Sequence, residues 1–110
     1  MENSEAQITE VLFVSLEHNK SLPSLDLHGI RPEEVRGKVF NFLSEQINLN
    51  RNAARIIYGR GGRGVLRREV LNFLQRNMRE TVDHQKLVKN FREQTLNDAG
   101  GSCVVLLKID

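Results

Sequence analysis

The sequence predicts an α/β domain, a two-layer sandwich of two main helices on a sheet of about four strands, in the order βαβαββ. Three observations lead to this prediction. Two apolar runs each end in a glycine-containing motif just before a helical pattern. Residues 102–109 form a continuous β-branched and aliphatic run. Strands alternating with amphipathic helices are typical of helices packed on a sheet.

The elements follow in order along the chain. Residues 1–7 are polar, and the apolar residues 8–16 suit a short helix or an edge segment. We expect residues 1–23 to form an N-terminal extension and linker, and residues 24–110 to form the domain. The first strand is expected at 25–28, the second at 53–58, the third at 86–91 and the last at 102–109, after a turn at 97–101.

Two helices are expected between these strands. The first opens at Arg31-Pro32-Glu33-Glu34, where proline and acidic residues are favoured in a first turn, and runs to about residue 48. The second follows the loop at 59–64. Each has apolar residues at helical spacing, which predicts one buried stripe. The stripe residues are Val35, Val39, Phe42, Leu43 and Ile47, then Leu66, Val70, Phe73, Leu74 and Met78.

Size and composition exclude several classes of protein. The 110 residues suffice for one domain, with 39% apolar and 27% charged residues, as in soluble globular proteins. One cysteine, Cys103, excludes an internal disulfide or a cysteine-rich metal site and suits a reducing compartment. No apolar stretch approaches the ~20 residues of a membrane span, and no signal-peptide pattern is present. We expect a cytoplasmic protein without a membrane partner.

Charge is divided unevenly along the chain. Residues 51–79 hold eight arginines and one acidic residue, Glu69, a net charge of +7. The remaining residues carry eight basic and thirteen acidic side chains, a net charge of −5. This division predicts a basic face that attracts polyanions such as DNA or RNA, with salt-sensitive binding. Arginine suits bidentate phosphate contacts, so a merely solvated helix is the less favoured alternative.

Asp26 and His28 form the first candidate site. Residues i and i+2 of a strand point to the same side, so the two side chains are expected to project together while Leu25 and Leu27 enter the core. An imidazole can transfer protons, and a carboxylate can orient it or hold a divalent ion such as Mg²⁺ or Mn²⁺. In the structural alternative, Asp26 caps the following helix or pairs with an arginine, and His28 only packs.

A glycine- and arginine-rich loop after the second expected strand forms the second candidate site. Its glycines permit close approach of the backbone to a ligand, and it leads into a helix N-terminus that attracts anions. If the two strands are neighbours, both motifs reach the same sheet edge, where α/β sheets place ligands. Tyr58 could bind a phosphate, stack on a base, or cap the rim of the core. The expected phosphate-binding residues are Arg31, Tyr58, Gly59, Arg60, Gly61, Gly62, Arg63, Arg67 and Arg68.

Two other phosphate-binding motifs fit poorly. Gly59, Gly61 and Gly64 match the dinucleotide fingerprint, but the acidic residue expected downstream would be Asp83, with no strand before it. The chain also lacks room for a second mononucleotide-binding half. Val65 occupies the position of the P-loop lysine. We therefore set aside nicotinamide-cofactor and P-loop chemistry.

The motifs together resemble the small MutS-related (Smr) domain. The resemblance runs from about Ser24 to Ile109 in order and spacing. It is carried by Leu25-Asp26-Leu27-His28-Gly29, Arg55-Ile56-Ile57-Tyr58-Gly59-Arg60-Gly61, Leu66-Arg67, Gly100-Gly101 and Val104-Val105-Leu106-Leu107. It implies a fold like the C-terminal domain of a bacterial translation initiation factor. It also implies nucleic-acid binding, commonly with endonuclease activity: DNA nicking, or RNA cleavage including that of mRNA on stalled ribosomes.

The resemblance assigns Asp26 and His28 to the family's D-x-H pair, and Gly59, Arg60 and Gly61 to its H-G-x-G or T-G-x-G loop. Tyr58 departs from the His or Thr usual at the first loop position. A tyrosine with a pKa of ~10 is a poor proton-transfer group near neutral pH. The sequence therefore leaves two functions open: an endonuclease, or a non-catalytic module that binds nucleic acid, a ribosome or a MutS-like protein.

Overall fold

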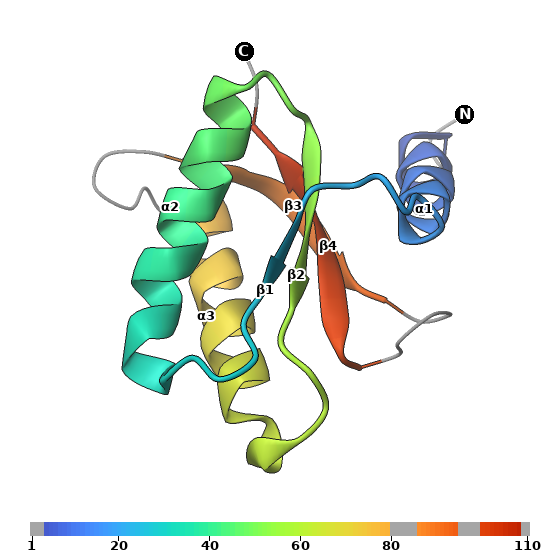
Figure 1. Ribbon diagram of the computed structural model, residues 1–110. Coiled ribbons are helices and arrows are strands. Elements are labelled where there is room, and N and C mark those ends of the chain that lie inside the picture. The colour runs from blue at the N-terminus through green and yellow to red at the C-terminus, as the bar shows by residue number, and fades with distance from the viewer. Residues whose placement is uncertain (1–3, 80–85, 95–99, 109–110) are drawn as a thin grey trace.

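The computed structural model of the chain describes residues 4–79, 86–94 and 100–108. A four-stranded sheet lies between two helices on one face and a third helix on the other (Figure 1). The helices are α1 (Ser4–Glu17), α2 (Val35–Asn48) and α3 (Val65–Arg79), and short 3-10 turns, η1 (Pro32–Glu34) and η2 (Gly62–Gly64), precede α2 and α3. The strands are β1 (Ser24–Asp26), β2 (Ala53–Ile57), β3 (Val88–Glu93) and β4 (Ser102–Leu107).

The sheet has the strand order β1-β2-β4-β3. β1 pairs with β2 in parallel, with Asp26 opposite Ile57, while β4 pairs with β2 and β3 in antiparallel fashion. The predicted α/β sandwich and its βαβαββ order from β1 onward are confirmed. The first two strands are neighbours, which is the condition on which the expected meeting of the two motifs depended. The carboxyl ends of β1 and β2 therefore lie at one sheet edge.

The main core lies between the sheet and the helices α2 and α3. Alternate strand residues such as Ala54 and Ile56 point into it and meet the apolar stripes of both helices, including Val39 and Leu74. β4 is buried over its whole length, because it is central in the sheet and both of its faces are covered. This explains why its sequence is continuously apolar and does not alternate.

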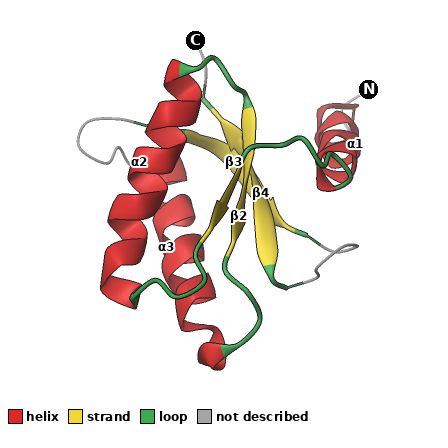
Figure 2. Cartoon of the chain, viewed as in Figure 1, coloured by secondary structure: helices red, strands yellow, loops and turns green. Residues whose placement is uncertain are grey.

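α1 covers the opposite face of the sheet (Figure 2). Phe13 and Leu22 pack with Ala53, Val104 and Leu106 in a second, smaller cluster. The sequence left residues 8–16 open between a helix and an edge segment, and the structure has a helix. Burial of the second face of β2 and β4 explains its position, since these apolar side chains would otherwise face water.

Arg55 does not belong to the expected basic face, which is a correction to the sequence analysis. Its guanidinium donates to the carbonyl oxygens of Leu16 (3.0 Å) and Glu17 (3.2 Å), the last residues of α1. Its Nε donates to Gln94 Oε1 at 2.6 Å. Because Arg55 lies between two core-facing residues of β2, strand alternation turns it toward α1. Its positive charge there complements the helix C-terminus.

Several element boundaries differ from those expected. β1 ends at Asp26, so His28 lies beyond the strand. β3 begins later and contains an irregularity between Val88 and Asn90, where a bulge inserts an extra residue. Part of the turn expected at 97–101 lies outside the described residues. In the described part of the chain, no helix is long and apolar enough to cross a membrane.

Candidate nucleic-acid cleavage site

Asp26 and His28 meet at the carboxyl end of β1. Asp26 Oδ1 accepts the backbone N–H of His28 at 3.0 Å and lies 2.5 Å from the ring nitrogen Nδ1. Strand alternation alone does not bring the pair together, because the turn after the strand also contributes. These two hydrogen bonds lower the pKa of Asp26 below its ordinary value, and the one from the backbone N–H has the larger effect. Asp26 is thus ionised at neutral pH, and a hydrogen bond to it requires a proton on Nδ1.

His28 Nε2 faces the start of the glycine loop. A Cβ on Gly59 would lie 3.1 Å from this nitrogen, closer than side chains ordinarily allow. Gly59 also has a φ of +77°, in the left-handed region that favours glycine. The backbone N–H groups of Tyr58 and Gly59 both donate to the carbonyl oxygen of Gly101, at 3.0 and 2.9 Å. β1, β2 and the residue before β4 thus fix the imidazole against the loop.

A shallow hollow of about 340 Å³ lies beside His28. It is lined by residues of the glycine loop and by Val65 and Leu66 at the start of α3. The first backbone N–H groups of a helix lack intrahelical partners and attract anions. The residues around the hollow are His28, Gly29, Tyr58, Gly59, Arg60, Gly61, Gly62, Val65 and Leu66.

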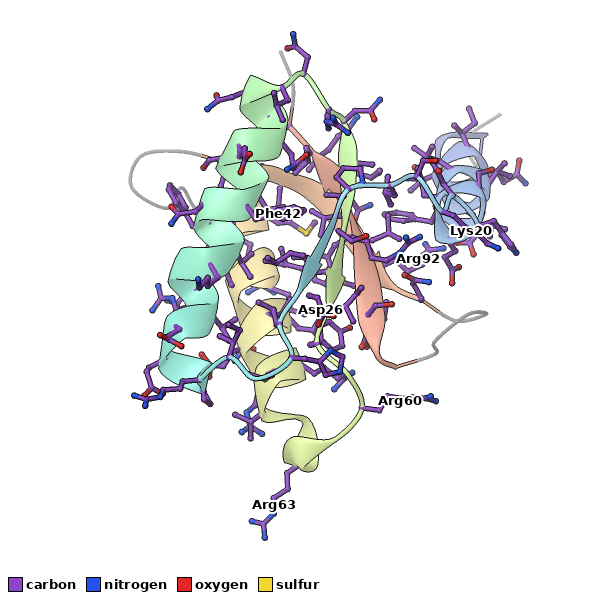
Figure 3. The ribbon with its side chains drawn as sticks, in the orientation of Figure 1. Lys20, Asp26, Phe42, Arg60, Arg63 and Arg92 are labelled. Atoms are coloured by element: carbon purple, nitrogen blue, oxygen red, sulfur yellow. The ribbon has the colours of Figure 1, made fainter. Side chains whose placement is uncertain are left out.

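The loop arginines extend away from the backbone (Figure 3). Arg60 and Arg63 project from the loop into solvent, on the side of the molecule where Asp26 lies. Neither has a hydrogen-bond or ion-pair partner among the described residues. Arg31 and Arg68 are exposed but do not line the hollow. The structure therefore brings Asp26, His28 and the loop from Gly59 to Gly62 together, with Arg63 adjoining.

Arg67 and Tyr58 are held by Glu93 on β3. Arg67 donates from Nε and Nη2 to the two carboxylate oxygens, each at 2.7 Å, and the Tyr58 hydroxyl donates to Oε2 at 2.7 Å. Tyr58 is only 3% exposed and belongs to the main core. Burial, and then the nearby Cys103 and Glu93, raise the pKa of Tyr58, so the hydroxyl keeps its proton. Its side chain thus occupies the core rim, one of the alternatives considered above.

Glu93 was missed by the sequence analysis. It lies on a strand that pairs with β4 and not with β2, and its side chain contacts residues 35 and 26 positions earlier. No local sequence pattern predicts such a contact, because the pairing register of β3 with β4 depends on the irregularity in β3. Glu93 orients the Tyr58 side chain and pairs with one arginine at the start of α3.

We expect Glu93→Gln to lower the free energy of unfolding by about 1–2 kcal/mol at neutral pH, since charged hydrogen-bond partners are lost. Arg67, and then the Tyr58 hydroxyl, hold the pKa of Glu93 below its ordinary 4.5. A lowered folded-state pKa gives stability that is present above about pH 4.5 and lost as the pH falls through the folded value. Urea unfolding of both proteins from pH 3 to pH 7 measures this difference.

The difference between wild type and Glu93→Gln should therefore shrink at acidic pH. Glu45→Gln is the control, because Glu45 is exposed on α2. It should show little difference at any pH. A wild-type to Glu93→Gln difference that is independent of pH would contradict the role given to the Glu93 charge.

Cys103 is the one cysteine of the chain. It is fully buried on β4, and burial raises the pKa of its thiol to about 12, so it is not a nucleophile.

Within residues 4–79, 86–94 and 100–108, no three or more His, Cys, Asp or Glu residues cluster as potential metal ligands. Asp26 and His28 are two donors that a metal bound to a phosphate could use.

Comparison with known proteins identifies one domain family. The Smr domain model matches residues 25–108. The chain is 36% identical over 87 residues to the endonuclease MutS2 of Ligilactobacillus salivarius, a match that covers 78% of this chain but 10% of that protein. The chain therefore spans a small fraction of the length of that relative.

Two solved structures have the same fold. The Smr domain of Thermus thermophilus MutS2 superposes with a TM-score of 0.66 at 27% identity, covering 79% of this chain and 99% of that one. YdaL, a stand-alone small MutS-related protein from Escherichia coli, gives a TM-score of 0.66 at 22% identity. The match covers 84% of this chain and 70% of that one. The second likeness shows the fold alone. Since the family model spans most of the sequence, this chain belongs to the Smr domain family.

Proposed function

We propose that this domain binds DNA or RNA across the hollow and cleaves a phosphodiester bond there, with His28 as the proton-transfer group. One observation carries the proposal: the Asp26–His28 pair leaves Nε2 facing the glycine loop. An ionised Asp26 holds a proton on Nδ1, which leaves Nε2 as the ring nitrogen that can take a proton from a substrate. The relative that is an endonuclease by name, MutS2 of Ligilactobacillus salivarius, supports cleavage as the activity.

In the proposed reaction, Nε2 takes the proton from the attacking oxygen, either a water or the 2′-hydroxyl of RNA. That oxygen forms a bond to phosphorus, and the bond from phosphorus to the leaving oxygen breaks. The leaving oxygen takes up a proton, which the imidazolium can return. Arg60 and Arg63 offset the negative charge that develops on the phosphate. Asp26 positions the ring and stabilises its protonated form.

A second candidate function is nucleic-acid binding without cleavage, or docking on a ribosome or a MutS-like protein. Tyr58 favours it, because a histidine or threonine is usual at this position in the family. The Tyr58 hydroxyl is also bonded to Glu93, so it offers no second proton-transfer group to the hollow. Under this alternative, Arg60 and Arg63 bind phosphates and Asp26 only positions the loop.

The test is incubation of the wild type with end-labelled single-stranded RNA and supercoiled plasmid, in EDTA, Mg²⁺ or Mn²⁺. We expect cleavage by the wild type to fall at least ~100-fold in His28→Ala, with affinity unchanged, because a general acid–base contributes about 10²–10⁴-fold. His18→Ala is the matched control, since His18 is an exposed histidine between α1 and β1.

The outcomes separate the candidate functions. Equal cleavage by wild type and His28→Ala would overturn the proposed catalytic role. Salt-sensitive binding without cleavage, lost in a double Arg60→Ala/Arg63→Ala variant, would support the binding module. Little affinity for either nucleic acid would leave docking on a protein as the better account. Comparison of the incubations in EDTA, Mg²⁺ and Mn²⁺ shows whether a divalent ion takes part in cleavage.

A further inference from the structure

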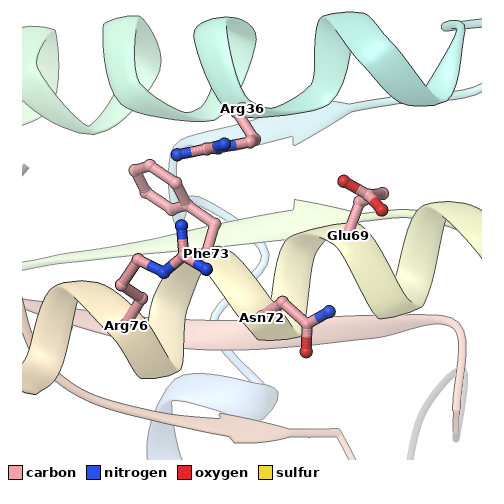
Figure 4. Close-up of a pocket in the computed structure, with 5 residues that line it drawn as sticks. All are labelled: Arg36, Glu69, Asn72, Phe73 and Arg76. Carbon is pink, nitrogen blue, oxygen red and sulfur yellow. The ribbon is translucent and has the colours of Figure 1, made fainter.

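A second pocket lies between α2 and α3, apart from the residues that line the hollow (Figure 4). Its volume is about 210 Å³, and it is lined by Arg36, Glu69, Asn72, Phe73 and Arg76. Arg36 comes from the first turn of α2, and the other four residues come from α3. Arg36 and Arg76 approach Phe73 from opposite sides in this view.

The arginines of this pocket have no counter-charge bound to them. Among the described residues, the side chains of Arg36 and Arg76 make no hydrogen bond or ion pair, and the Glu69 carboxylate that also lines the pocket makes none either. The three charges sum to +1. Two guanidinium groups that line one small pocket repel one another, and an anion bound there offsets this repulsion.

The remaining lining suits a phosphate group. Asn72 also lines the pocket, and its amide is a neutral hydrogen-bond donor. Phe73 lines it too and is only 4% exposed, and an apolar side chain there reduces the screening of nearby charges by water. Guanidinium groups bind phosphate oxygens with two parallel hydrogen bonds. A phosphodiester is therefore the ligand class that this pocket fits.

α3 connects this pocket to the hollow. Arg68, Asn72, Arg76 and Arg79 follow one another at intervals of four, four and three residues, which places them along one side of the helix. All four are exposed. Leu66 lines the hollow, and the rise of a helix puts Arg76, ten residues later in α3, about 15 Å further along. At about 3.4 Å per stacked nucleotide, this distance corresponds to about four or five nucleotides.

We propose that the α2–α3 pocket is a second phosphate subsite, which holds a single strand of nucleic acid about four or five nucleotides away from the phosphate at His28. This inference rests on the proposed function, because it extends the path of the same strand. The subsite makes affinity depend on the length of the strand as well as on its charge.

The experiment compares binding of a trinucleotide and a twelve-nucleotide strand, RNA and DNA, over a range of salt concentrations. For Arg36→Ala/Arg76→Ala, we expect about tenfold weaker binding of the long strand and unchanged binding of the short one. The salt slope for the long strand should fall by about 0.7–1.4, the contribution of one or two phosphate contacts on single strands. Glu69→Gln should strengthen binding of the long strand, because it removes the negative charge from the pocket.

Arg51→Ala is the matched control, since Arg51 is an exposed arginine in the turn between α2 and β2. Equal loss for both strand lengths, or no loss for either, would overturn the subsite. If Arg60→Ala/Arg63→Ala alone abolishes binding of both strands, the proposed function stands while the subsite fails. If the wild type binds neither strand, both proposals fail. Thermal unfolding checks that the exposed substitutions leave the fold intact.

Discussion

Gly59→Ala is expected to lower nucleic-acid cleavage about 100-fold or more, although alanine adds only one methyl group. The new Cβ would lie 3.1 Å from His28 Nε2, so the ring or the loop must move. A displacement of about 1 Å in a catalytic group can cost about 10²-fold in rate. The left-handed backbone at Gly59 adds about 1–2 kcal/mol of strain for a residue with a Cβ. Single-turnover cleavage and urea unfolding measure the two effects separately.

Gly100→Ala is the matched control for the Gly59 experiment. Gly100 has a φ of +79°, close to that of Gly59, but among the described residues its Cβ would meet the Arg60 side chain, at an ordinary 3.9 Å. Both variants should lose similar stability, and only Gly59→Ala should lose most of its cleavage. If both lose cleavage equally, general loop strain and not the contact with His28 would be the cause.

Asn77→Ala is expected to lower the free energy of unfolding by about 3 kcal/mol. Asn77 is fully buried in α3, and its Oδ1 accepts the backbone N–H groups of Leu87 at 2.7 Å and Val88 at 2.8 Å. Alanine leaves two buried donors without this acceptor, and each unsatisfied group costs about 1–3 kcal/mol. Because small domains are stable by only about 5–15 kcal/mol, this is a large share of the total. Urea unfolding at neutral pH measures the loss.

Two further variants test whether the lost hydrogen bonds are the cause. Asn72→Ala removes the same side chain from the exposed side of α3 and should change stability little. Asn77→Leu fills the volume but provides no acceptor, so it should be at least as destabilising as alanine. Restoration of stability by leucine would show that a cavity, and not the unpaired N–H groups of Leu87 and Val88, explains the loss.

The sequence predicted much of the fold because the elements that cover the core have clear patterns of apolar residues. The stripes of α2 and α3 and the apolar run of β4 each indicate burial directly. The sequence left open whether the first two strands are neighbours. The structure pairs β1 with β2 in parallel, as is common for two strands joined by a helix. The segment of α1 was ambiguous, since Ile8, Val11 and Leu12 fit a helix while the apolar residues 11–14 also suit a strand.

The interactions between distant elements could not be read from the sequence. Strand alternation turns Arg55 away from the main core, but only the position of α1 decides that it caps a helix. Glu93 reaches Tyr58 and Arg67 through a register that includes a bulge, and bulges leave no pattern in a single sequence. The Asp26–His28 contact was expected, although the turn that creates it was taken for part of a strand.

β4 has a consequence for the order in which this domain assembles. It follows the other three strands in the sequence, yet it lies between β2 and β3 in the sheet. The carbonyl of Gly101, just before β4, also holds the N–H groups of Tyr58 and Gly59. While the chain is being synthesised, β1 and β2 emerge early, but β3 has no strand to pair with until β4 emerges. A nascent chain therefore carries the Asp26–His28 motif long before it can hold the glycine loop against it, so the geometry of the proposed site forms only after β4 has joined the sheet.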